Sequence, residues 1–225
     1  MKAVVIIPAL NEAGCIGALV AETLRQPVEK VVVVDNGSTD QTAREAAQAG
    51  AEVVGEARRG YGYACAAGVA AAGEADVLIF LDGDYSCLPG EIVMLLTPLR
   101  ANQADLVIGS RELGHIAPGA MPSHQRFGNW LTARLMNLLY GLQLTDLGPY
   151  RAVRRELLDQ LAMREMTFGW PTEMTVKAAR RRARILEVPV SWLPRRAGRS
   201  KISGTLRGTV LAAYYILGVT VRYAF

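Results

Sequence analysis

The first half of the chain alternates short, uninterrupted runs of apolar, mostly β-branched residues with alanine-rich stretches. The runs occupy residues 4–7, 31–34, 53–54, 77–81 and 106–108. Strands that are buried on both faces have this continuous hydrophobicity, which is typical of a parallel sheet covered by helices. We therefore predict an α/β fold, with helices at residues 14–24, 41–49, 61–72 and 89–101 between the strands. Asp40 is the expected N-cap of the second helix.

The second half has a more helical pattern. After a loop at 115–122 we predict helices at 125–140, 154–163 and 171–182, and then short strands at 185–188 and 190–193. A basic loop at 194–204 precedes a final helix. No linker or repeat separates the two halves of the 225-residue chain. We therefore predict one domain, 1–225, whose composition changes near residue 115.

Charge is divided unequally between the halves. Residues 1–120 carry 8 basic and 15 acidic side chains, whereas residues 121–225 carry 17 basic and 6 acidic ones. Arginine supplies 21 of the 25 positive charges, which favours recognition of phosphate or carboxylate. Aromatic residues are not interleaved with the basic runs and no nucleic-acid recognition motif occurs, so we expect no nucleic-acid partner.

Neither cysteine spacing nor hydropathy indicates a secreted or membrane-spanning chain. Cys15, Cys65 and Cys87 are far apart and include no C-x-x-C pair, so we expect a reducing compartment. The stretch between Arg207 and Arg222 is free of charge but has only 14 residues, short of the ~20 that span a bilayer. We expect a cytoplasmic protein.

Polar residues follow three of the predicted strands. These segments are 8–12 (PALNE), 35–40 (DNGSTD) and Asp82-Gly83-Asp84. In open parallel sheets the ligand site lies beyond the carboxyl ends of the strands, so these segments should meet. The two carboxylates around Gly83 bring like charges close together, which favours a bound divalent cation that bridges substrate phosphates.

Five ordered motifs together resemble one family. They are the three segments above, Gly109-Ser110-Arg111, and the tail 195–201 (RRAGRSK). The chain resembles the GT-A fold glycosyltransferases of family 2, and within them the polyprenyl-phosphate (dolichyl-phosphate) mannose and glucose synthases. The resemblance implies a GT-A fold with a single Rossmann-like, mostly parallel sheet. It implies a nucleotide-sugar-binding half at 1–114 and an acceptor-binding half, basic and helical, at 115–225.

The resemblance also implies roles for individual residues. Pro8, Leu10, Glu12 and Asp35 would hold the nucleoside, and Asp82, Gly83 and Asp84 would hold Mg²⁺ or Mn²⁺ with the donor pyrophosphate, Asp84 being counted as catalytic. Arg195 and Lys201 would reach the donor phosphates from a mobile loop.

Three segments depart from the family's pattern. Gly60-Tyr61-Gly62 stands where the family often has Gly-Lys-Gly, and Ser86 stands where a metal-ligating Gln is common. Residues 146–150 (DLGPY) replace D-P-x-S-G-F. Glycosyl transfer remains the expected activity, while the donor sugar, the nucleotide base of the donor and the acceptor stay open.

The acceptor decides the remaining chemistry. A hydroxyl acceptor must lose a proton to a carboxylate base, for which Asp146 and Glu173 are the candidates. A phosphate monoester is already ionised and needs cations instead, for which Arg111, Arg126 and also Arg134 are available. We expect a polyprenyl-phosphate acceptor, with a soluble hydroxyl acceptor as the alternative.

Apolar residues recur at helical spacing in the last segment, at 206, 210, 213, 217 and 221. This pattern fits a core helix or an interfacial helix equally well. With basic residues at both ends, the second interpretation predicts peripheral contact with an anionic membrane surface on its inner, cytoplasmic side.

Overall fold

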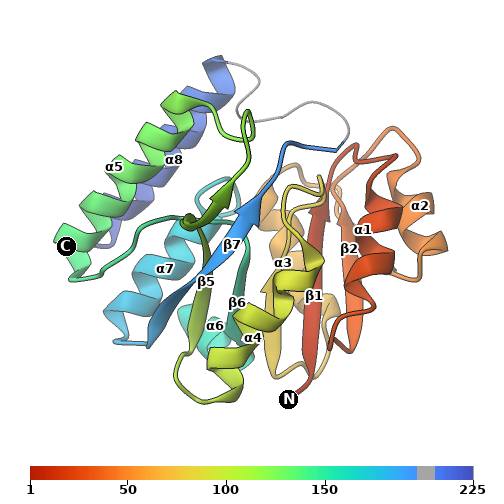
Figure 1. Cartoon of the computed structure of the whole chain (residues 1–225), viewed down its shortest axis with the longest axis horizontal. Helices are drawn as coiled ribbons and strands as arrows, with labels where there is room; N and C mark the ends of the chain where they lie inside the picture. The colour runs from red at the N-terminus through yellow and green to blue at the C-terminus, as the bar shows by residue number, and fades with distance from the viewer. Residues whose placement is uncertain (197–205, 225) are drawn as a thin grey trace.

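The computed structural model of the chain describes residues 1–196 and 206–224, and within 206–213 it describes the backbone only. In these residues seven strands form one sheet in the order β3-β2-β1-β4-β6-β5-β7 (Figure 1). The strands are β1 (Ala3–Ala9), β2 (Lys30–Asp35), β3 (Glu52–Gly55), β4 (Val77–Phe80), β5 (Leu106–Ile116), β6 (Arg151–Arg154) and β7 (Ile185–Trp192). The expected mostly parallel α/β sheet is confirmed, because only β6 runs antiparallel to its neighbours.

Helices cover both faces of this sheet. They are α1 (Ile16–Thr23), α2 (Thr42–Gln48), α3 (Tyr61–Ala71), the short 3₁₀ helix η1 (Pro89–Glu91), α4 (Ile92–Arg100), α5 (Ser123–Tyr140), α6 (Arg155–Leu161), α7 (Trp170–Arg180) and α8 (Leu206–Arg222). Side chains of α1, α2 and α4 pack on one face, and those of α3, α6 and α7 pack on the other. Alternate residues of β1 enter opposite cores, as the uninterrupted apolar runs required.

Four local expectations were wrong. The strands expected at 185–188 and 190–193 are a single strand, β7. Residues 151–154 form β6, which was not predicted because its sequence, RAVR, contains no apolar run. β5 continues to Ile116 instead of ending at residue 108, since its later residues pair with β7. The N-cap of α2 is Gln41, while the carboxylate of Asp40 accepts a hydrogen bond from the Thr42 amide at 3.0 Å.

Strands from both halves of the chain share the one sheet. β6, β5 and β7 follow β4 in the strand order, so the charge boundary near residue 115 falls inside a strand. α5 and α8 lie side by side, outside the helices that cover the sheet (Figure 1). Among the described helices, none is long and apolar enough to cross a membrane.

Candidate active site

The carboxyl ends of β1, β2 and β4 bring three predicted segments together. β1 pairs with β2 on one side and with β4 on the other. A Cβ built on Gly83 would lie 3.3 Å from the Pro8 carbonyl oxygen and 3.4 Å from Glu12 Cγ. The Asp82–Asp84 turn therefore packs directly against the segment that follows β1, as its position at the sheet edge predicted.

The two aspartates differ in their surroundings. Burial, followed by the charge of Asp84, raises the pKa of Asp82 to about 7. The Tyr61 hydroxyl donates a hydrogen bond to Asp82 at 3.3 Å and stabilises its ionised form. Asp84 is buried, and its Oδ1 accepts hydrogen bonds from the Ser86 amide at 3.0 Å and the Ser86 hydroxyl at 2.5 Å.

Arg195, which follows β7, joins two of the predicted donor-site carboxylates. Its Nη1 lies 2.8 Å from Asp84 Oδ2, and its Nη2 lies 2.7 Å from both oxygens of Glu12. Although burial opposes the charge of this guanidinium, Asp84 and Glu12 raise its pKa. Arg195 thus brings a fixed positive charge to the Asp82–Asp84 turn from the second half of the chain.

The predicted nucleoside-binding residues lie at the ends of β1 and β2. Pro8 is in β1, opposite Val34, and Asp35 is the last residue of β2. Asp35 Oδ1 accepts a hydrogen bond from the Ser38 amide at 2.9 Å. Leu10, the other predicted nucleoside contact, is partly exposed just beyond β1. These residues are brought together where the motifs indicated.

Sequence reasoning missed Asn36, the neighbour of Asp35. Its side chain is buried and donates hydrogen bonds to the carbonyls of Glu56 at 2.9 Å and Arg58 at 2.7 Å. It also accepts one from the Gly60 amide at 2.9 Å. Asn36 therefore fixes the loop that delivers Tyr61 to Asp82. An amide side chain directly after a buried strand was the available signal.

Arg111 and Asp146, two of the residues predicted to act on the acceptor, form a buried pair. Asp146 is fully buried, and its oxygens accept hydrogen bonds from Arg111 Nε and Nη2, each at 2.7 Å. Although burial opposes its ionisation, Arg111 lowers the pKa of Asp146. Arg111 Nη1 makes no hydrogen bond to any residue that the structure describes. Burial opposes the charge of Arg111, but Asp146 raises the pKa of this guanidinium, and the charge of Asp82 adds a smaller contribution in the same direction.

Glu173 lies elsewhere, in the first turn of α7. It is fully buried, and its oxygens accept hydrogen bonds from Lys177 Nζ and the Tyr223 hydroxyl, both at 2.7 Å. The amides of Arg164 and Glu165 donate two more, at 2.8 and 2.7 Å. These contacts join α7, the loop before it and the end of α8. The structure therefore does not bring Glu173 to the aspartate turn.

Arg126 and Arg134 are on the exposed side of α5. Arg126 is paired with Glu112 through Nε at 2.9 Å and Nη2 at 2.7 Å. The guanidinium carbon of Arg134 lies 5.7 Å from the centroid of the Trp130 ring. Neither side chain belongs to the Arg111–Asp146 pair.

Arg151, on β6, is a second residue that sequence reasoning missed. Its side chain is buried, where Nη2 donates to the Gly148 carbonyl at 2.5 Å and Nη1 to the Pro171 carbonyl at 2.7 Å. Burial lowers its pKa to about 10, and that shift is opposed by Tyr61 and Asp146 and, to a smaller extent, by Asp82. Arg151 thus places a buried positive charge within electrostatic reach of Asp146 and Asp82. Nothing in its local sequence marked it as buried.

Two predictions fall on residues that the structure does not describe. Lys201 and most of the basic loop 194–204 lie outside the described ranges. Within those ranges, no cluster of three or more His, Cys, Asp and Glu side chains could hold a metal ion. A divalent ion at Asp82 and Asp84 would therefore complete its coordination with substrate oxygens and water, as Mg²⁺ sites commonly do.

Comparison with known proteins agrees with these motifs. The family described as Glycosyl transferase family 2 matches residues 4–162. A glycosyltransferase of Mycobacterium tuberculosis is 38% identical over 208 residues, covering 92% of this chain and 93% of that protein. The undecaprenyl-phosphate mannosyltransferase of Micrococcus luteus is 32% identical over 237 residues, covering 99% of this chain and 96% of that protein.

Solved structures share the fold. Glucosyl-3-phosphoglycerate synthase from Mycobacterium tuberculosis, in complex with Mn²⁺, UDP-glucose and phosphoglyceric acid, superimposes with a TM-score of 0.79 at 24% identity. The superposition covers 99% of this chain and 79% of that one. The GT-A architecture expected from the motifs is confirmed. By the family match and by its relatives, the chain belongs to glycosyl transferase family 2 and is a glycosyltransferase.

Proposed function

We propose that the protein transfers a hexose from a nucleotide-diphospho-sugar of the GDP-mannose or UDP-glucose type to a polyprenyl phosphate. The donor part of the proposal rests on one observation: Glu12, Asp35, Asp82 and Asp84 converge at one edge of the sheet. Arg195 contacts Glu12 and Asp84 there. The acceptor assignment is supported by relatives named undecaprenyl-phosphate mannosyltransferase and polyprenol monophosphomannose synthase.

The aspartate turn fits a divalent cation. Burial and, after it, the charge of Asp84 raise the pKa of Asp82; a bound cation would relieve the repulsion between the two carboxylates, and Arg195 already provides one positive charge there. Asp82 and Asp84 would hold Mg²⁺ or Mn²⁺, the latter being the ion in the solved complex of the synthase above. When bound, the ion would stabilise the negative charge that develops on the leaving pyrophosphate.

The chain's own residues would hold the donor around this ion. Asp35, Pro8 and Leu10 would bind the nucleoside, and Gly83 allows the turn to approach Glu12. Arg195 would move from Glu12 and Asp84 to the donor phosphates, joined by Lys201. Charge-assisted hydrogen bonds from a guanidinium suit that task because its fork matches phosphate oxygens.

For the acceptor, the contacts of Arg111 and Asp146 favour a nucleophile that is already ionised when it binds. A phosphate monoester has a second pKa near 6 and needs no base at neutral pH. Arg111 would contact it through the Nη1 edge, while Asp146 would position Arg111 by holding its other edge. Arg126 would add a second cation once it leaves Glu112. Asp146 is therefore proposed as a positioning residue.

A soluble hydroxyl acceptor is less well supported. It would require Asp146 or Glu173 to remove a proton, and both carboxylates are fully buried and bound by cations. Glu173 in addition belongs to the α7–α8 packing. We propose a structural role for Glu173.

α5 offers a surface for the membrane contact that a polyprenyl acceptor requires. Its exposed large apolar residues Phe127, Trp130, Leu131 and Leu138 share one face with Arg134 and lie opposite its buried Thr132 and Met136. α5 and the adjacent α8 contain no acidic residue. An apolar stripe with only positive charge fits an anionic bilayer surface. α8 also exposes Tyr214 and Val221 but buries Val219, so it is partly core.

A thermal-shift panel tests the donor side. UDP- and GDP-sugars are compared with and without Mn²⁺, and one nucleotide-sugar should stabilise the protein only when the metal is present. A ligand at 100 times its Kd adds about 2.7 kcal/mol of stability. Equal melting temperatures throughout the panel would contradict the proposal.

A further inference from the structure

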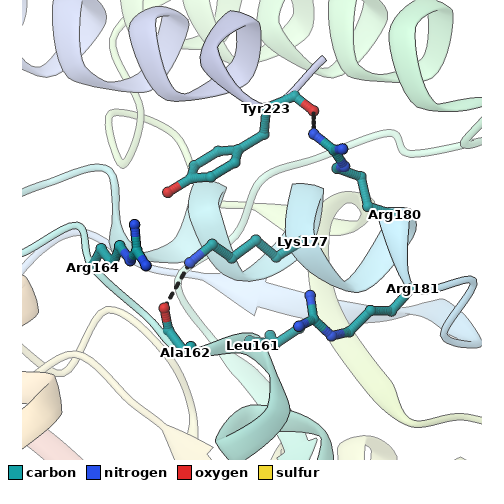
Figure 2. A pocket seen from close by; sticks show the side chains of 7 residues that line it. All are labelled: Leu161, Ala162, Arg164, Lys177, Arg180, Arg181 and Tyr223. Atoms are coloured by element: carbon teal, nitrogen blue, oxygen red, sulfur yellow. Dashed lines mark hydrogen bonds between the residues drawn. The ribbon is translucent and has the colours of Figure 1, made fainter. Parts of the chain in front are cut away.

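A cavity of about 310 Å³ lies beside the second half of α7 (Figure 2), and no residue of the aspartate turn lines it. Its walls come from the end of α6, the following loop, α7, and the residue after α8. The lining residues are Leu161, Ala162, Arg164, Lys177, Arg180, Arg181 and Tyr223. None of them belongs to the donor or acceptor residues described above. We call this hollow the basic cavity.

Two of its four cations are already bound. Lys177 Nζ lies 2.7 Å from Glu173 Oε1 and 2.7 Å from the Ala162 carbonyl oxygen, so its charge is balanced within the protein. Arg180 Nη1 donates to the Tyr223 carbonyl at 2.5 Å, which fixes the end of the chain after α8 over the cavity (Figure 2). Lys177 and Arg180 are therefore held in place by contacts within the protein.

The other two cations have no counter-charge. The guanidinium groups of Arg164 and Arg181 make no ion pair or side-chain hydrogen bond with any described residue, and both are exposed. No acidic residue lines the cavity. Arg164, Arg180 and Arg181 therefore bring three positive charges to one concavity, balanced by no lining carboxylate. A bound anion would supply the counter-charge that the lining residues lack.

We propose that the basic cavity is a second anion site that binds a phosphate group. Guanidinium forks suit phosphate oxygens, and the volume accommodates a group of that size. The phosphate could belong to a free anion or to a lipid headgroup, because α8, which also exposes Tyr214 and Val221, ends at this cavity. This proposal does not depend on the donor and acceptor proposed above.

The test compares two charge-matched double variants of the full chain. R164Q/R181Q removes the unpaired cations of the basic cavity. R25Q/R182Q removes two exposed arginines that do not line it, one of which is adjacent to Arg181 in sequence. Calorimetry in EDTA measures the affinity for inorganic phosphate and pyrophosphate. Sedimentation measures binding to vesicles of phosphatidylcholine with and without phosphatidylglycerol.

R164Q/R181Q should weaken binding of the relevant probe by 10-fold or more, roughly the loss of one or two charge-assisted hydrogen bonds, while R25Q/R182Q binds like the wild type. If R164Q/R181Q binds phosphate or pyrophosphate more weakly, the ligand is a free phosphate. If it is weakened only in binding to anionic vesicles, the ligand is a lipid headgroup. The proposal is overturned if the two variants bind both probes equally. Unchanged donor binding in both variants would show that the transfer site is a separate one.

Discussion

Arg195 Nη1 lies 2.8 Å from Asp84 Oδ2, so a cation from the second half of the chain neutralises a carboxylate of the first half. The same guanidinium contacts both oxygens of Glu12 at 2.7 Å. A metal ion at the aspartate turn and Arg195 would thus compete for one oxygen. Removal of Arg195 should therefore strengthen metal binding and weaken donor binding.

Arg195→Gln should bind Mn²⁺ more tightly in the absence of nucleotide, because the competing cation is gone. The same variant should bind the nucleotide-sugar roughly 10-fold more weakly in saturating Mn²⁺, because a charge-assisted hydrogen bond to phosphate is lost. Paramagnetic resonance measures free Mn²⁺, and calorimetry measures the donor. Arg25→Gln is the control. Weaker Mn²⁺ binding by Arg195→Gln would contradict the competition.

Asp84→Asn should abolish metal-dependent donor binding and leave the protein folded. The substitution removes a metal ligand. Relief of the repulsion with Asp82 offsets the lost ion pair with Arg195, and the amide oxygen of the new side chain can still accept the Ser86 hydrogen bonds, so the fold is expected to persist. Calorimetry with and without Mn²⁺ measures the effect, and Asp159→Asn on the surface of α6 serves as control. Unchanged donor affinity in Mn²⁺ would exclude a metal at this turn.

Asp146→Asn should lower the free energy of unfolding by about 3–5 kcal/mol, because it leaves the Arg111 guanidinium buried without its counter-charge. Arg126→Ala, which breaks the exposed pair with Glu112, should leave the free energy of unfolding nearly unchanged, because solvent screens that pair. Urea denaturation of both variants gives the comparison. Similar decreases in the free energy of unfolding of the two variants would mean that the buried Arg111–Asp146 pair does not stabilise the fold more than the exposed pair does.

The same pair predicts a direction of pH dependence. The pKa of Asp146 is lower in the folded chain than its unfolded value of 3.8. Its contribution to stability is therefore present above about pH 4 and is lost as the pH falls through the lower folded value. The stability difference between wild type and Asp146→Asn should shrink below pH 4. A difference that grows on acidification would contradict the lowered pKa.

F127S/W130S should reduce sedimentation with anionic vesicles several-fold, because the two rings, whose centroids are 5.8 Å apart, dominate the exposed stripe of α5. V93S/M94S removes two exposed apolar side chains from α4 and should bind vesicles like the wild type. Equal vesicle binding by both variants would exclude α5 as the membrane surface.

The sequence could predict the donor side because its signals are local. Each strand that supplies it is an uninterrupted apolar run, and each ends in a short polar motif such as 82–84. The positions of parallel strand ends then follow from the fold class. Tyr61 and Ser86 were recognised as departures from the family's pattern, but their hydrogen bonds to Asp82 and Asp84 required coordinates.

The acceptor side could not be predicted as well, because its contacts join distant segments. Arg111 and Asp146 are 35 residues apart, and nothing in either motif indicates that they bind each other. Glu173 is bound by Lys177 four residues later and by Tyr223, 50 residues away. A carboxylate on a predicted helix looks the same in sequence whether it faces substrate or a buried lysine.

The central claim is tested most directly by turnover with two acceptor classes. Purified wild-type protein, Mn²⁺ and the nucleotide-sugar found in the thermal-shift panel are incubated with a short-chain polyprenyl phosphate or with soluble hydroxyl acceptors, and transfer of labelled hexose is measured. The account predicts transfer to the polyprenyl phosphate, with a rate that does not change above the acceptor's second ionisation. Transfer only to the soluble acceptors would contradict it.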